Sequence, residues 1–252
     1  MFDTHAHIDS FDDVKLKEVI ERAKKAGIEQ IVNPSAEPSN FERVLKIAEE
    51  NDFVYAALGV HPEETDKFKD DSIERIRELS KHKKVVAIGE IGLDYYWTTE
   101  TKEKQKEIFK AQVELAKELN LPLIIHDREA HEDTFNILKS AKLGDIKVIM
   151  HCFSGSREFM KQCVKEGWYI ALGGVVTFKN SVKAKEVAID VPIEKLLLET
   201  DCPYLAPVPY RGKENEPSYI VETAKFIADL RGISFEELEQ ITTRNACEVF
   251  KI

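Results

Sequence analysis

Apolar residues in this chain alternate between two kinds of segment. Short apolar runs of strand length are followed by longer segments in which apolar residues recur at the spacing of an amphipathic helix. Leu16, Val19, Ile20 and Ala23 have this helical spacing, and Gly27 follows them as a terminator. The pattern predicts a regular succession of strands and helices.

Eight segments have the apolar character of strands, and many are near-continuous apolar runs. They cover residues 2–8, 28–33, 53–60, 85–89, 122–125, 148–150, 169–172 and 196–198, the last extending toward Asp201. Such runs indicate a parallel sheet that is covered on both faces. Eight strand–helix units close naturally into a barrel, so the predicted fold is α/β, a single (β/α)8 TIM barrel domain over residues 1–252.

Helix starts are visible where polar capping residues precede apolar periodicity. Ser156 is a predicted N-cap after the sixth strand. Pro217 is expected to open a C-terminal helix, and Ser234 with Glu237 three residues later forms the capping box of another. The barrel is therefore expected to carry additional C-terminal helices.

Composition narrows the class of protein. The chain has 252 residues, of which 33% are charged, and its net charge of -10 argues against a broad basic surface for nucleic acid. It has no apolar run of transmembrane length and no signal peptide, so we expect a cytoplasmic protein without a membrane partner. No obligatory protein partner is evident. The four cysteines lack Cys-x-x-Cys spacing and are expected to be reduced, with Cys152 and Cys202 facing the helices.

Candidate chemistry lies at the ends of the predicted strands. In barrels of this kind catalytic groups lie at the carboxyl ends of the strands. Metal-ligand residue types follow five of the eight strands: His5, His7, Glu90, His126, His151 and Asp201. Each alone could be a structural strand-end residue, but their shared rim favours a common site.

Imidazole and carboxylate ligands suit zinc and manganese, and carboxylates with water suit magnesium. Six ligands exceed the needs of one tetrahedral cation. We therefore predict two divalent metal ions (Mg, Mn or Zn) that are bridged by Glu90 and a water. Asp201 is the candidate general base. Alternation along the first strand is expected to point Asp3, His5 and His7 in one direction.

Further residues are candidates for supporting roles. Asp3 and Glu199 are expected one layer deeper in the barrel, where they orient metal ligands or belong to a water-bridged structural network. His61, Arg128 and Arg211 fall on predicted loops at the same rim. These three are candidate substrate contacts, and a solvated or ion-paired surface role is the alternative.

Motifs in order along nearly the whole chain are similar to those of the TatD family of metal-dependent deoxyribonucleases. They are Asp3-Thr4-His5-Ala6-His7, Gly59-Val60-His61-Pro62, Gly89-Glu90-Ile91-Gly92-Leu93-Asp94-Tyr95-Tyr96, Ile125-His126-Asp127-Arg128, His151-Cys152-Phe153-Ser154-Gly155, Glu199-Thr200-Asp201-Cys202-Pro203-Tyr204-Leu205 and Asn215-Glu216-Pro217. The resemblance implies a metallohydrolase barrel, a two-metal site built from the six residues above, and DNA hydrolysis.

These inferences favour an exonuclease that acts on single-stranded or frayed DNA ends, because a rim with short loops forms a pit that admits an end more readily than a duplex. One alternative is an amidohydrolase-like enzyme acting on a small molecule. Two-metal members of that group commonly have a carboxylated lysine after the fourth strand, where this chain has Glu90. A metal-binding protein without turnover is the other alternative.

Overall fold

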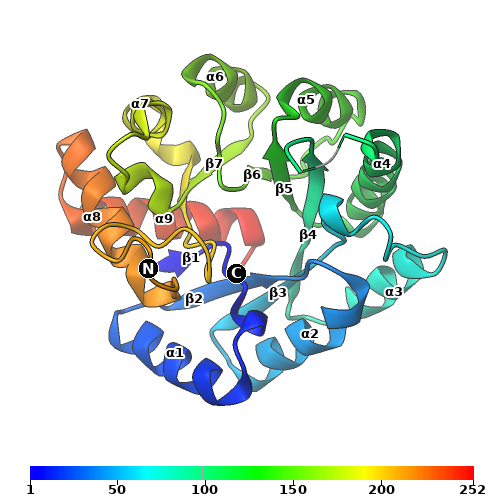
Figure 1. Ribbon diagram of the computed structural model, residues 1–252, viewed down its shortest axis with the longest axis horizontal. Coiled ribbons are helices and arrows are strands. Elements are labelled where there is room, and N and C mark those ends of the chain that lie inside the picture. The colour runs from blue at the N-terminus through cyan, green and yellow to red at the C-terminus, as the bar shows by residue number, and fades with distance from the viewer. Residues whose placement is uncertain (98) are drawn as a thin grey trace.

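A computed structural model describes residues 1–97 and 99–252. Eight parallel strands form one sheet in the order β1 to β8, and helices surround them (Figure 1). The strands are β1 (Phe2–Asp3), β2 (Gln30–Pro34), β3 (Val54–Leu58), β4 (Val85–Asp94), β5 (Leu123–Arg128), β6 (Val148–Met150), β7 (Tyr169–Leu172) and β8 (Leu196–Leu198). The predicted (β/α)8 fold is confirmed.

Backbone hydrogen bonds join the two ends of the sheet. Thr4 N–H donates to Leu198 O over 3.1 Å, and Asp201 N–H donates to His5 O over 2.9 Å. These contacts bring the segments after β1 and β8 side by side, although they lie far apart in the sequence. The ring therefore closes just below the carboxyl-terminal mouth.

The helices follow the strands in the predicted alternation. They are α1 (Asp13–Lys25), α2 (Phe41–Glu50), α3 (Ser72–Leu79), α4 (Lys102–Leu119), α5 (His131–Ser140), α6 (Arg157–Lys165), α7 (Val182–Asp190), α8 (Ile220–Arg231) and α9 (Phe235–Phe250). Ser156 and Ser234 accept hydrogen bonds from the backbone N–H groups of Phe159 and Glu237, as their N-cap positions predict. Pro217 begins a short 3-10 turn ahead of α8. Within the described residues, none of these helices is long and apolar enough to cross a membrane.

The amino-terminal end of the barrel is filled by apolar side chains. Val32, Ile124 and Leu197 belong to an interior cluster that also includes Val249 and Phe250 of α9. Phe250 stacks on Phe2 of β1 with a ring-centroid distance of 5.5 Å. Because α9 covers this end, the polar interior groups gather at the opposite, carboxyl-terminal mouth.

Several strand boundaries differ from the sequence prediction. β5 runs to Arg128, so His126 and Arg128 lie on the strand and not after it. β1 ends at Asp3, and His7 precedes a short 3-10 turn over Ile8–Ser10. β4 continues to Asp94, with a shift in its pairing to β5 between Ile88 and Ile91. Glu90 therefore lies within an irregular part of β4, not after the strand as predicted. Such an irregularity re-aims the side chain at that position.

Candidate active site

The side chain of Glu90 lies at the centre of the mouth, and this residue is 3% exposed. Its Oε2 atom lies 3.2 Å from His5 Nε2 and 3.3 Å from His7 Nε2. Its Oε1 atom lies 2.8 Å from His126 Nδ1 and 3.4 Å from His151 Nε2. One carboxylate thus presents a different oxygen to each of two pairs of histidines.

Asp201 approaches both histidine pairs from β8. Its Oδ1 atom lies 3.9 Å from His5 Nε2, 3.8 Å from His7 Nε2 and 3.9 Å from His151 Nε2. All six ligands predicted from the sequence therefore converge on one volume. They come from the ends of β1, β5, β6 and β8 and from the irregular part of β4.

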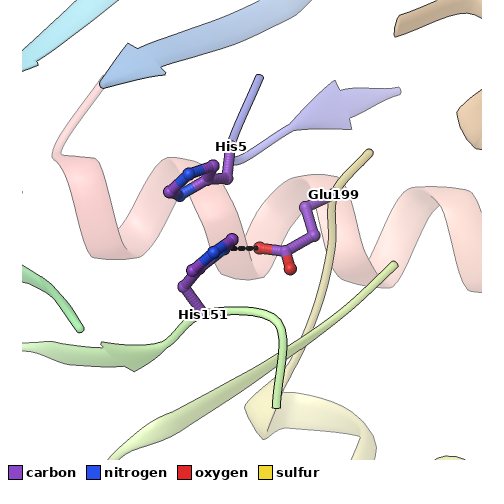
Figure 2. A group of neighbouring side chains, drawn as sticks. All are labelled: His5, His151 and Glu199. Atoms are coloured by element: carbon purple, nitrogen blue, oxygen red, sulfur yellow. Dashed lines mark hydrogen bonds and ion pairs between the residues drawn. The ribbon is translucent and has the colours of Figure 1, made fainter. Parts of the chain in front are cut away.

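Glu199 fixes the orientation of His151. Figure 2 shows His5 and His151 with their rings face to face, and the ring centroids are 3.5 Å apart. The dashed line in Figure 2 joins His151 Nδ1 to Glu199 Oε2, at 3.0 Å. The other oxygen of Glu199 accepts from Cys152 N–H over 2.7 Å. Because Nδ1 is held by Glu199, Nε2 of His151 is directed into the site.

Asp3 supports the site through hydrogen bonds to the backbone segments that carry His5 and Asp201. Its carboxylate accepts hydrogen bonds from the N–H and hydroxyl of Thr200, at 3.0 and 2.6 Å, and from His5 N–H at 3.3 Å. Asp3 therefore holds the backbone of His5, while His5 Nδ1 has no hydrogen-bond partner among the described residues. Asp3 and His5 do not share a strand face, as strand alternation predicted, because β1 ends at Asp3 and does not extend to His5.

Asp94 is a site residue that the sequence reasoning missed. Its Oδ2 atom lies 2.9 Å from His126 Nε2, so His126 lies between the carboxylates of Asp94 and Glu90. Gln105 of α4 bonds both the N–H and the carbonyl of Asp94 and holds this strand end in place. A signal for Asp94 is present in the sequence, because the apolar run of β4 continues past Glu90 and ends at this carboxylate. In the structure β4 continues to the same point, where Asp94 pairs with Arg128 of β5.

His61 lies closer to the cluster than a loop position suggested. Its Nδ1 atom accepts a hydrogen bond from Glu63 N–H over 3.2 Å, so the neutral ring carries its proton on Nε2. That atom lies 3.4 Å from Glu90 Oε1. Burial, and next the neighbouring His126, lower the pKa of His61, which favours the neutral ring. His61 can therefore donate a hydrogen bond into the site.

Cys152 does not face the helices as predicted. Its sulfur lies within 4.8 Å of ligand atoms of His151 and Asp201. The backbone of Cys152 has a positive φ of 42°, which breaks the strand alternation after His151 and turns the thiol toward the mouth. Cys202, in contrast, is buried among apolar residues as expected.

Arg128 and Arg211 lie on aromatic rings. The Arg128 guanidinium carbon is 3.9 Å from the centroid of Tyr96, and that of Arg211 is 4.3 Å from the centroid of Phe178. Among the described residues, no carboxylate oxygen comes within 4.0 Å of either guanidinium. Both cations are therefore available to an anionic ligand.

Several side chains of the cluster have pKa values far from their ordinary ones. Burial opposes ionisation of Glu90, but the surrounding imidazoles of His151, His61 and His5 hold its pKa well below the ordinary value. Burial lowers the pKa of His151, but the carboxylates of Glu199 and Glu90 outweigh it and raise the pKa to about 10. Burial raises the pKa of Asp201 to about 6. The cluster thus combines a buried anion with imidazolium groups that a cation would replace.

The donor set fits divalent cations. His5, His7 and Glu90 present ligand atoms that lie within 4.8 Å of one another. Imidazole nitrogens and carboxylate oxygens are ligands of zinc and manganese. Five imidazoles facing buried carboxylates would be costly without cations or protons to balance the charge. The residues present therefore match a metal centre.

Comparison with known proteins places the chain in a family. The family model described as TatD related DNase matches residues 2–251. The metal-dependent hydrolase YabD of Bacillus subtilis is 49% identical, and the match covers 100% of this chain and 99% of that protein. The metal-dependent hydrolase YcfH of Escherichia coli is 38% identical, with 100% and 96% covered.

Solved structures agree with the sequence matches. The crystal structure of YjjV, a TatD homologue from Escherichia coli, is 34% identical and has a TM-score of 0.94, with 100% of this chain and 98% of that one covered. A TatD family hydrolase from Entamoeba histolytica is 25% identical with a TM-score of 0.90, and the match covers 99% and 97% of the two chains. The chain therefore belongs to the TatD family of metal-dependent hydrolases.

Proposed function

We propose that this hydrolase is a two-cation phosphodiesterase that removes nucleotides from single-stranded or frayed ends of DNA. The observation that carries the proposal is the Glu90 carboxylate, which directs one oxygen to His5 and His7 and the other to His126 and His151. A carboxylate placed in this way is suited to bridging two cations. The family description as a DNase supports DNA as the substrate.

When bound, two divalent cations would polarise the phosphoryl oxygens and lower the pKa of a bound water toward neutrality. His5, His7 and Asp201 would hold one cation, His126 and His151 the other, and Glu90 both. Zinc, manganese and magnesium are the candidates, and the number of imidazoles favours the first two.

The chain supplies the remaining chemistry. Asp201 is the candidate base that accepts the proton of the attacking water, because its Oδ1 atom lies within 4 Å of three of the histidine nitrogens that face the site. Glu199 keeps the His151 ring in place while this happens. His61 donates its Nε2 proton in a hydrogen bond to a phosphoryl oxygen. Arg128 and Arg211 contact phosphates, since neither has a carboxylate partner among the described residues.

The test is hydrolysis after removal and return of the metal. Chelated protein should be inactive on single-stranded DNA, and Mn²⁺, Zn²⁺ or Mg²⁺ should restore release of mononucleotides. Glu90→Gln and Asp201→Asn should not recover, whereas Glu114→Gln on the exposed side of α4 serves as a matched control. Duplex DNA, RNA, and small esters and amides are measured in parallel.

Three outcomes contradict the proposal. Undiminished DNA cleavage after chelation excludes the metal mechanism. Hydrolysis of a small amide without cleavage of DNA supports the amidohydrolase alternative. Stoichiometric metal binding without turnover of any substrate supports a binding protein.

A further inference from the structure

Two aromatic side chains stand exposed at the rim of the site. Tyr96 is 55% exposed and Trp97 is 64% exposed, and both lie within three residues of the end of β4. Their rings meet edge to face, with centroids 4.9 Å apart and an angle of 85° between the planes. Large aromatic side chains left in contact with solvent beside a polar site indicate a binding surface.

Asp94 links this aromatic pair to the histidine cluster. Its Oδ1 atom accepts hydrogen bonds from the N–H groups of Tyr96 and Trp97, at 2.9 and 3.2 Å. Its Oδ2 atom lies 2.9 Å from His126 Nε2. The Asp94 carboxylate therefore bonds to the backbone of the aromatic pair and to His126, a candidate metal ligand. It ties the aromatic pair to the edge of the histidine cluster.

Arg128 completes the surface. Its guanidinium carbon lies 3.9 Å from the centroid of Tyr96 and 5.4 Å from that of Trp97. Arg128 is two residues beyond His126 on β5, so their Cα atoms are about 6.6 Å apart at ~3.3 Å per residue. The Arg128 guanidinium is therefore carried by a position nearer the end of β5 than His126, on the outer side of the histidine cluster.

Arg128 differs from most other arginines because no carboxylate among the described residues pairs with it. In this acidic chain most other arginines contact carboxylates, namely Arg22, Arg43, Arg75, Arg77 and Arg157. Arg128 instead lies on aromatic rings, which orient a guanidinium without neutralising it. A ligand that joins an anionic group to a flat ring matches this surface, because the anion can pair with Arg128 and the ring can lie on an aromatic side chain. An apolar peptide would leave the Arg128 charge without a partner.

We propose that Tyr96, Trp97 and Arg128 form a platform on which an unpaired nucleobase stacks while Arg128 holds the adjoining phosphate. The inference rests on the proposed nuclease function and specifies how that site selects its substrate. Stacking on an aromatic ring tolerates any base, because every base has a π-face. Bases inside a duplex already stack on both sides, so the platform selects single strands without reading sequence.

Trp97 provides a direct readout. Trp168 is 5% exposed, so the accessible tryptophan fluorescence comes from Trp97. A hydrolysis-resistant phosphorothioate single strand is titrated into the metal-loaded protein, beside a strand of equal length that lacks its bases. The strand with bases should quench the fluorescence and bind about 5- to 150-fold more tightly, the range that corresponds to the stacking of one base.

Variants separate stacking from general damage. Trp97→Ala should raise KM for single-stranded DNA within the same range, with metal content and hydrolysis of a strand without bases unchanged. Trp97→Phe should retain most of the affinity because it keeps an aromatic face. Ile189→Ala, an exposed apolar residue at the far end of α7, is the matched control and should match the parent protein.

Equal affinity for strands with and without bases would overturn the platform, as would a Trp97→Ala variant with normal KM on DNA. Both results leave the nuclease proposal standing if DNA is still cleaved. Absence of metal-dependent cleavage of any oligonucleotide refutes the nuclease proposal itself, whatever the fluorescence shows.

Discussion

Replacement of Glu90 by glutamine should damage hydrolysis far more than replacement of Arg128 by alanine. Glutamine keeps the shape of the side chain but removes the negative charge that faces histidines on two sides, at 2.8 to 3.4 Å. Unit charges 4 Å apart attract each other by about 4 kcal/mol at an effective dielectric constant near 20. Loss of that attraction at a single cation corresponds to about a 1,000-fold change in rate or metal affinity.

Arg128→Ala removes one hydrogen-bonded charge contact at the rim of the site. Such a contact contributes about 1.5–3 kcal/mol, or roughly 10- to 150-fold, and the loss should fall mainly on KM. Metal content by elemental analysis and steady-state kinetics on single-stranded DNA give the two comparisons. A Glu90→Gln enzyme that keeps two cations and turns over near the normal rate would refute the bridging role.

Further predictions concern protons, stability and salt. Metal ligands must be unprotonated, and the neighbouring carboxylates outweigh burial and raise the pKa of His126 to about 9 and that of His151 to about 10. Cation binding at pH 7 should therefore release about two protons, and it should weaken as pH falls. Calorimetry in buffers of different ionisation enthalpy measures the released protons, and a binding heat that does not depend on the buffer would contradict this expectation. Burial raises the pKa of Asp3 to about 8, above its unfolded value of 3.8, so the folded state retains a proton that the unfolded state loses. Stability of the metal-free protein should decline as pH rises from about 4 to 8, and Asp3→Asn should flatten that decline in thermal melts at successive pH values. With a net charge of -10, single-stranded DNA binding should follow salt with a slope of about −1.4 to −2.1, equivalent to two or three phosphates. A much steeper slope that persists after chelation would reveal a basic groove.

The candidate ligands could be located from the sequence because their positions follow a rule of topology. Parallel strands in a barrel bring their carboxyl ends to one rim, so His126 after an apolar run and His151 after another had to be neighbours. Hydrophobic periodicity locates such runs: His151 directly follows β6 as predicted, and His126 lies near the end of β5, two residues before the strand ends.

The errors arise where the backbone leaves ideal strand geometry. Alternation predicts a common face for Asp3 and His5 only if β1 continues, and β1 has two residues. A positive φ reverses the direction expected for Cys152, and a pairing shift places Glu90 inside its strand. Hydrophobic periodicity encodes neither such irregularities nor the tertiary contacts beside them, such as the bonds between Gln105 and the backbone of Asp94 at the end of β4.

The brevity of β1 has a consequence for the order in which the protein matures. Besides its pairing with β2, the segment Phe2–Thr4 is secured by partners that are synthesised much later: Phe250 of α9 stacks on Phe2, and Leu198 accepts bonds from Thr4, 194 positions away. His5 and His7 come within four residues of β1 and gain part of their positioning only when later segments have docked, since Asp201 N–H donates to His5 O and His7 N–H donates to Cys202 O. A nascent chain on the ribosome therefore carries its first two metal-ligand candidates long before it can hold them in place. Acquisition of the metal becomes a late event, coupled to completion of the barrel, and partly made chains should be unable to hydrolyse anything.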